Sequence, residues 1–131
     1  MPSAFVPAGL TDDHVQLRKL VRDFVNARVI PTASESEAKD EYPDDLIPEL
    51  ADLGLFGITV SEEYGGSDLD YVSYGLIFEE LARGWMALAS LVYTTSSGGY
   101  LISEFGTEDQ KNRFLPDMAA GRRMSGIALT E

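Results

Sequence analysis

The sequence contains no cysteine and a single histidine, and both shortages limit the chemistry that the chain can perform. Without cysteine there is no disulfide framework, no thiolate zinc site and no cysteine nucleophile, which fits a reducing cytoplasm. A serine-histidine-aspartate triad would need His14, which lies at the start of an expected helix. We therefore interpret His14 as a surface residue. Residues 1–10 also lack the basic region of a secretory signal peptide, so we expect a cytoplasmic protein.

Basic residues are also scarce, since 10 lysines and arginines stand against 22 acidic residues and give a net charge of −12. Such a surface repels phosphate backbones and anionic lipids, so we expect neither nucleic acid nor a membrane as a partner. The acidic pairs at 12–13, 44–45 and 62–63 lack the spacing of an EF-hand loop. Two of these pairs lie at expected helix starts, where the helix dipole accounts for them, and we predict no metal site.

Helix signals cover most of the chain, whose 44% content of apolar residues is typical of one soluble globular domain. Thr11 precedes two aspartates at a helix start, and Thr107 with Gln110 matches a capping box. Pro31 is expected to stop or kink the first helix, and Gly54 is placed for a left-handed C-terminal cap. The patterns predict an all-α fold of about five to six helices, over residues 11–30, 33–39, 43–54, 68 or 70 to 84, 85–103 and 107–115, with a further short turn of helix from Pro116 to Gly121.

The run from Trp85 to Ser103 contains no charged side chain. Its middle, residues 94–99, reads Thr-Thr-Ser-Ser-Gly-Gly and is polar and small, whereas a membrane-spanning helix is apolar along its length. We therefore predict a helix that is buried on most sides. Its small residues would let another helix or a ligand approach closely.

The last eight residues differ from the helical part, because Met124, Ile127 and Leu129 are bulky apolar residues among small ones. This pattern is typical of an extended strand that is buried on at least one face. A strand needs hydrogen-bonding neighbours, which either a following sheet or a partner must supply. We expect a helical domain over residues 1–122 and, over residues 123–131, the first strand of a truncated β-barrel domain.

Several ordered segments resemble the acyl-CoA dehydrogenase family, and together they run almost the length of the chain. They are residues 53–66 with the turn Glu-Glu-Tyr-Gly-Gly, residues 79–83, residues 105–116, and Ala-Leu-Thr-Glu at 128–131, which is similar to the start of the family's flavin-site signature. Ser61 stands where the family usually has proline. The chain ends before the proline and the Gly-Ser-Asp that normally complete the signature.

The resemblance implies the N-terminal helical domain of a larger FAD enzyme, with a β-barrel-like middle domain, a C-terminal four-helix domain and assembly as a homotetramer or dimer. Such enzymes remove the α-proton of an acyl-CoA thioester with a glutamate base and pass the β-hydrogen as hydride to flavin N5. The flavin supplies the redox chemistry. The resemblance places no catalytic residue in this chain, since Glu131 is not that base, and it makes an electron-transferring flavoprotein a candidate partner. We therefore expect the chain alone to be inactive.

The resemblance also implies site residues. The segment from Ile127 to Thr130 would lie along the isoalloxazine ring, where a backbone group near Leu129 and the hydroxyl of Thr130 would bind the polar edge. The charge-free helix would line the acyl tunnel, with candidate residues Tyr93, Thr94, Ser97 and Gly98. Packing in the core is the alternative explanation for these four residues. A large Tyr93 facing the tunnel would favour a short or unusual acyl chain.

Two other interpretations of the sequence stay open. The chain could be a helical interaction or oligomerisation module, in which case another subunit would have to cover the apolar terminal strand. It could also belong to a flavin oxidase or monooxygenase of the same fold. Substrate length and the electron acceptor are not determined by these residues.

Overall fold

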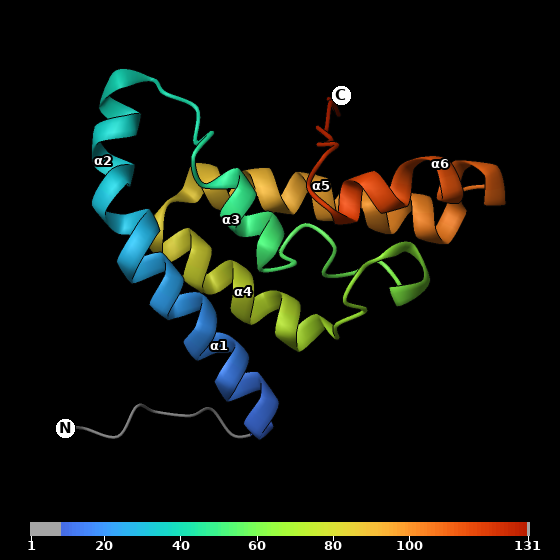
Figure 1. Ribbon diagram of the computed structural model, residues 1–131, viewed down its shortest axis with the longest axis horizontal. Helices are drawn as coiled ribbons and strands as arrows, with labels where there is room; N and C mark the ends of the chain where they lie inside the picture. Colours follow the sequence, from blue (N-terminus) through green and yellow to red (C-terminus); the bar gives the residue numbers. More distant parts are fainter. Residues whose placement is uncertain (1–8, 131) are drawn as a thin grey trace.

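A computed structural model describes residues 9–130, and within this range every regular element is a helix. Figure 1 shows the helices packed side by side, with the C-terminal end of the chain running back across α5. The prediction of an all-α fold is confirmed. The elements are α1 (Asp12–Phe24), the π-helical turn η1 (Val25–Val29), α2 (Ile30–Lys39), α3 (Ile47–Asp52), the short 3-10 helix η2 (Glu62–Tyr64), α4 (Tyr71–Gly84), α5 (Met86–Phe105) and α6 (Glu108–Ala119).

The first predicted helix does not stop at Pro31. It passes through η1 into α2, and the chain changes direction there (Figure 1). The wider π-turn places Pro31 in the first turn of α2, where its missing N–H costs little. The short helix predicted at 33–39 is therefore a full helix from Ile30, and it ends at Asp40 in the left-handed region, with φ of 55°.

A long irregular segment, residues 53–70, follows α3 and contributes to the core. Helix α3 begins at Ile47, later than predicted, and Gly54 has the predicted left-handed backbone with φ of 72°. Phe56, Ile58 and Val60 are almost fully buried, although none of them lies in a helix. The segment is closed on itself by backbone hydrogen bonds from 67, 68 and 69 to the carbonyl groups of 57, 60 and 58, respectively, at 2.9, 3.0 and 2.8 Å. These bonds satisfy backbone groups that burial would otherwise leave unpaired.

Helices α1 and α4 lie against each other, α4 packs on α5, and α5 packs on α6. Apolar side chains such as Val21, Ile77 and Leu88 fill the space between them and are fully buried. Glu80 is buried in the same interface with 1% of its surface exposed. Its carboxylate accepts hydrogen bonds from Arg18, Arg22 and Arg83, and we call these four residues the Glu80 cluster.

His14 is not a surface residue, contrary to the prediction. It is 8% exposed, and its Nδ1 accepts a hydrogen bond from the backbone N–H of Thr11 in the capping box of α1. Its Nε2 lies 2.9 Å from Oδ2 of Asp70, whose other carboxylate oxygen caps α4 by accepting from the N–H of Ser73. The first turns of α1 and α4 are therefore joined through one histidine.

The last helix begins at the predicted capping box of Thr107 and Gln110. It does not break at Pro116 but continues to Ala119, and its buried residues Leu115 and Ala119 pack against Val60. Gly121, with φ of 68°, then reverses the chain. None of the helices in the described part of the chain is long and apolar enough to cross a membrane.

Residues 124–130 contain no strand in the structure, although the sequence predicts one. A strand is defined by hydrogen bonds to a neighbouring strand, and none of the described residues forms such a neighbour. That these residues pair with a β domain in a longer protein, and that a domain boundary lies near 122, stay predictions. Residue 131, which is not expected to be the catalytic base, lies outside the described residues.

Candidate functional site

The four predicted pocket residues lie together on α5, in two adjacent rows. Residues four apart in a helix face the same side, so Tyr93 and Ser97 form one row, and Thr94 and Gly98 form the next. Because the run contains no charged side chain that would have to reach solvent, the inner face of the helix can be buried. Val92, Thr95 and Ser96 are buried on that face. The structure therefore brings all four candidates to one side of one helix.

The Tyr93 row is part of an aromatic surface that α5 shares with α4. The rings of Tyr93 and Phe78 meet edge to face, with centroids 5.9 Å apart, and Phe78 in turn contacts Tyr74 at 4.5 Å. Tyr93 is 48% exposed, so its ring is available to another molecule or domain. Burial raises the pKa of Tyr74, and a hydrogen bond with Ser97 acts in the opposite direction. This row therefore offers aromatic rings and hydroxyl groups.

The Thr94 row is covered by the end of the chain. Ser125 donates its hydroxyl to the carbonyl oxygen of Thr94 at 2.7 Å, and its backbone N–H lies 3.5 Å from Oγ1 of Thr95. Gly98 lies directly beneath Ser125, so a Cβ at position 98 would overlap the serine hydroxyl. Met124 packs against the main core. The chain beyond α6 is therefore seated on the helix that contains the predicted pocket residues.

The predicted flavin segment continues from this seat into solvent. Ile127 is 52% exposed and Leu129 is 88% exposed, and Thr130 is exposed as well. The backbone of this segment is not part of any helix, so its N–H and C=O groups are free to bind a polar ring edge. The residues present therefore fit the group that the resemblance implies. Ser125 fixes this segment on α5, and no local pattern in the sequence indicates that role.

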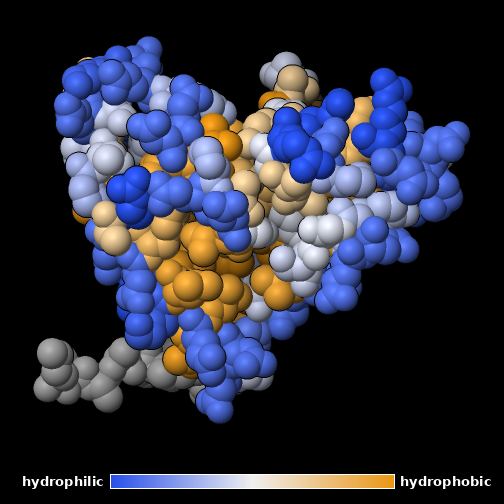
Figure 2. Space-filling model, in the orientation of Figure 1, coloured by the Kyte–Doolittle hydropathy of each residue, from blue (hydrophilic) through white to orange (hydrophobic). Residues whose placement is uncertain are grey.

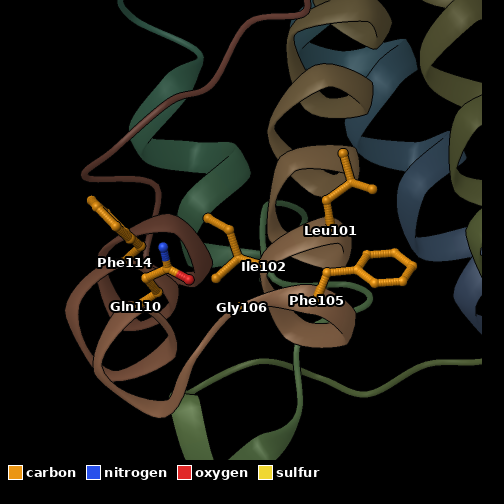
Figure 3. Close-up of a pocket in the computed structure, with 6 residues that line it drawn as sticks. All are labelled: Leu101, Ile102, Phe105, Gly106, Gln110 and Phe114. Atoms are coloured by element: carbon orange, nitrogen blue, oxygen red, sulfur yellow. The ribbon is translucent and has the colours of Figure 1, made fainter.

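An apolar hollow of about 250 Å³ lies at the turn between α5 and α6, away from the predicted pocket residues, and it was not predicted. Figure 3 shows Ile102 of α5 facing Gln110 and Phe114 of α6, whereas the ring of Phe105 points away from α6. Phe105 is 80% exposed. The sequence gives only a weak signal for this hollow, namely apolar residues on both sides of the capping box.

Another hollow, of about 340 Å³, lies between the irregular segment and α5. Three of its lining residues are the acidic Asp68, Asp70 and Glu104, which disfavour a phosphate group there. Hydrogen bonding with Tyr71 raises the pKa of Tyr100 in the same hollow. Within the described residues, no group of three or more histidine, aspartate or glutamate side chains is arranged to hold a metal ion.

Apolar residues gather in the middle of the face seen in Figure 2, over α3 and α4, and hydrophilic residues surround them. Large apolar residues are also exposed elsewhere on the chain, including Met86, Leu101 and Phe105 of α5. An exposed apolar area of this kind marks a surface that another domain or molecule covers.

The comparisons with known proteins agree with this architecture. A family model described as "Acyl-CoA dehydrogenase, N-terminal domain" matches residues 11–122. An acyl-CoA dehydrogenase of Bacillus subtilis is 40% identical over 123 residues, which are 93% of this chain and 32% of that protein. The chain thus spans about a third of the length of this curated relative.

Solved structures give the same result. Butyryl-CoA dehydrogenase from Megasphaera elsdenii is 36% identical, with a TM-score of 0.82 over 91% of this chain and 32% of that one. A glutaryl-CoA dehydrogenase from Mycobacterium smegmatis in complex with FADH2 is 33% identical, with a TM-score of 0.82 over 88% of this chain and 30% of that one. The chain therefore belongs to the acyl-CoA dehydrogenase family, and it contains the family's N-terminal domain.

Proposed function

We propose that this chain acts as the N-terminal part of an FAD-dependent enzyme that introduces an α,β double bond into an acyl-CoA thioester. Its helical domain supplies one wall of the acyl pocket, and residues 127–130 supply one edge of the flavin site. The observation that supports the proposal is the seating of Ser125 on Thr94, which brings the predicted flavin segment next to the predicted pocket helix. The base and the remainder of the FAD site lie outside the described residues.

FAD would be held by the exposed end of the chain. A backbone group at Leu129 and the hydroxyl of Thr130 would bind the polar edge of the ring system, and Ile127 would pack beside it. When bound, FAD supplies the hydride acceptor, and the protein supplies orientation and exclusion of water. A related structure holding FADH2 supports this assignment.

The acyl chain of the substrate would lie against the aromatic surface formed by Tyr93 of α5 and Phe78 of α4. Tyr93 occupies space on this face and is supported from behind by Phe78, so it would shorten a pocket built here. We therefore propose a short or branched acyl group. Relatives named as short-chain and isobutyryl-CoA dehydrogenases are 31% and 32% identical to this chain and support that range.

Two kinds of partner belong to the same proposal. The first is a further copy of the protein, since exposed apolar residues such as Met86 and Leu101 need a cover. The second is an electron-transferring flavoprotein as electron acceptor. Support comes from a solved structure described as the electron transferring flavoprotein of Acidaminococcus fermentans, to which this chain is 30% identical.

The test joins residues 1–131 of this chain to the part of the Bacillus subtilis acyl-CoA dehydrogenase that follows its own matching region. We expect the chimera to purify with a visible flavin band and to lose that band when butyryl-CoA is added without oxygen. The 131-residue chain, checked by mass, should have no flavin band. A flavin-free chimera would contradict the proposal, and a flavin band in the 131-residue chain would contradict the assignment of most of the FAD site to other residues.

The same samples distinguish the alternative of an interaction module. Such a module would already form a stable oligomer as a 131-residue chain. Fusion to the Bacillus subtilis part would then not increase its oligomeric state. Analytical ultracentrifugation of both proteins measures this difference.

A further inference from the structure

We propose that Ser125 is a positioning residue: seated against Gly98 and hydrogen-bonded to Thr94, it sets where the flavin segment lies relative to the pocket helix. The inference rests on the proposed function, because it assigns a role within that same site. It concerns a residue outside both groups of predicted site residues. Three contacts converge on residue 125 and its immediate neighbour.

The first contact is the hydrogen bond from the Ser125 hydroxyl to the carbonyl oxygen of Thr94, at 2.7 Å. Thr94 lies inside α5, so its carbonyl already takes part in the helix, and the serine uses the second lone pair. Because the acceptor is a main-chain atom of a long helix, its position is fixed by the helix and not by a mobile side chain.

The second contact is the fit of Ser125 against Gly98. A Cβ at position 98 would overlap the serine hydroxyl and would lie 2.9 Å from the serine Cβ. Glycine lowers the stability of a helix interior by about 1 kcal/mol relative to alanine, so its presence in α5 has a cost that this close approach explains. Gly98 thus forms a notch into which one particular residue of the returning chain fits.

The third contact fixes the chain on the other side of the notch. The hydroxyl of Thr95, which is fully buried, lies 3.5 Å from both Sδ of Met124 and the backbone nitrogen of Ser125. The residue before the serine is therefore anchored in the core. Ile127, the first residue of the flavin segment, follows two residues after Ser125, so only Gly126 lies between the anchored residue and this segment.

The consequence for the site is geometric. With Ser125 seated, residues 127–130 leave α5 at a fixed point beside Thr94 and Gly98. A shift of this segment by one residue would move the flavin-binding groups along the acyl pocket by about 3.3 Å. A shift of about 1 Å can already lower a hydride-transfer rate on the order of a hundredfold.

The seating itself is tested in the 131-residue chain without flavin. The chain has no cysteine, so spin labels attach only at Lys19→Cys on α1 and Ile127→Cys. We expect Gly98→Ala to broaden the measured distance distribution about twofold, because the released segment gains the freedom of a loose terminus. The Ser125→Gly background lacks the hydrogen bond and should itself give a broader distance distribution. There Gly98→Ala should add little, since both serine atoms that the methyl group would meet are gone and only the flexible end of Met118, at 3.2 Å, remains near it.

The matched control is Gly75→Ala in α4, where no atom lies within 4 Å of the added methyl group. It should leave the distance distribution unchanged in both backgrounds. Equal broadening by Gly98→Ala with and without the serine side chain would overturn the seating of Ser125, and so would an unchanged distribution in the serine-containing chain.

The positioning role is tested in the flavin-containing chimera. We expect Ser125→Ala to lower the rate of flavin bleaching at saturating butyryl-CoA by about tenfold, with the apparent Kd of butyryl-CoA changed less than about twofold. Ser34→Ala, at an exposed position on α2 away from this site, is the control and should change neither value. An unchanged rate in a Ser125→Ala chimera that holds flavin would overturn the role. A parent chimera without flavin would count against the proposed function. The spin-label distances in the 131-residue chain would then still test the seating of Ser125, because they need no flavin.

Discussion

The Glu80 cluster shows how a buried charge can stabilise this domain. Burial by itself raises the pKa of the Glu80 carboxyl, but hydrogen bonds from Arg22, Arg18 and Arg83 outweigh burial and lower that pKa to about 2. The ordinary value is 4.5, so the folded state favours the ionised carboxylate. This contribution to stability is fully present above pH 4.5 and is lost as the pH falls towards 2.

The replacement Glu80→Gln keeps the side-chain shape and removes the charge that the three arginines face. We expect the free energy of unfolding at pH 7 to fall by about 2–3 kcal/mol, less than the roughly 3–5 kcal/mol for a fully enclosed pair, because the arginines reach solvent. Urea unfolding followed by circular dichroism measures the loss. The gap between parent and variant should close as the pH falls from 4.5 towards 2.

The control for this replacement is Glu79→Gln. The Glu79 carboxylate is exposed and accepts a hydrogen bond from the Arg18 guanidinium at 3.2 Å. Removing its charge should change the free energy of unfolding by no more than about 0.5 kcal/mol. A similar loss in both variants would show that burial of Glu80 makes no difference.

Contacts between single residues were predictable from the sequence where both partners lie within one helical turn. The Thr107 and Gln110 box is such a case, because its spacing alone defines the hydrogen bonds. His14 was assigned wrongly to the surface, since the residue that buries and binds it, Asp70, belongs to a helix far along the chain. No local pattern contains that information.

At the scale of helices, α4 crosses η1 at a glycine. A Cβ on Gly84 would lie 2.5 Å from Cγ1 of Val25 and 3.2 Å from Cγ1 of Val29. Both valines are fully buried, and their branched side chains have little freedom to move. The close crossing therefore depends on the absence of a side chain at position 84.

Replacing Gly84 with alanine should lower the free energy of unfolding by about 1–3 kcal/mol, because the methyl group overpacks the crossing. Gly75→Ala in the same helix has open space around it and should raise the free energy of unfolding by about 0.5–1 kcal/mol through helix propensity. Thermal unfolding of both variants measures the two effects. A gain in stability for Gly84→Ala would contradict the close crossing.

Helix boundaries show what the sequence could not determine. Pro31 was expected to stop or kink its helix and Pro116 to begin a separate short turn. The structure changes direction at the first position and continues helical backbone through both. At Pro31 the π-turn absorbs the missing donor, and at Pro116 the packing of Leu115 and Ala119 on Val60 supports the last turns. A local change of helix type accommodates proline at the first position, and tertiary packing outweighs its local preference at the second.

At the scale of the whole molecule, the net charge of −12 acts on stability through self-repulsion. We expect the melting temperature at pH 7 to rise by about 3–5 °C between about 0.01 and 0.15 M sodium chloride, as the Debye length falls from about 30 to about 8 Å. Exposed ion pairs oppose this rise only weakly. Scanning calorimetry at both salt concentrations measures the shift.

The control uses the same scans at pH 4.3, near the isoelectric point of the chain. There the net charge is close to zero and salt should have no stabilising effect through self-repulsion. An equal rise at both pH values would contradict the electrostatic explanation.

The sequence indicated the fold and the family because the resembling segments extend over nearly the whole chain. It also placed Tyr93, Thr94, Ser97 and Gly98 on one helix, since their spacing is local. Ser125 could not be recognised in this way. Its contact with α5 arises only after Gly121 reverses the chain, and that path depends on how α5 and α6 pack.

The bond between His14 and Asp70 has a consequence for how the molecule opens. The N–H groups of Thr11, His14 and Ser73 are all bound within one connected set of polar atoms. When the first turn of α1 frays, His14 leaves Asp70, and the cap of α4 loses its support. We therefore expect the amide hydrogens of these three residues to exchange with solvent as one cooperative unit in a native-state exchange measurement, although the two helices are far apart in the sequence.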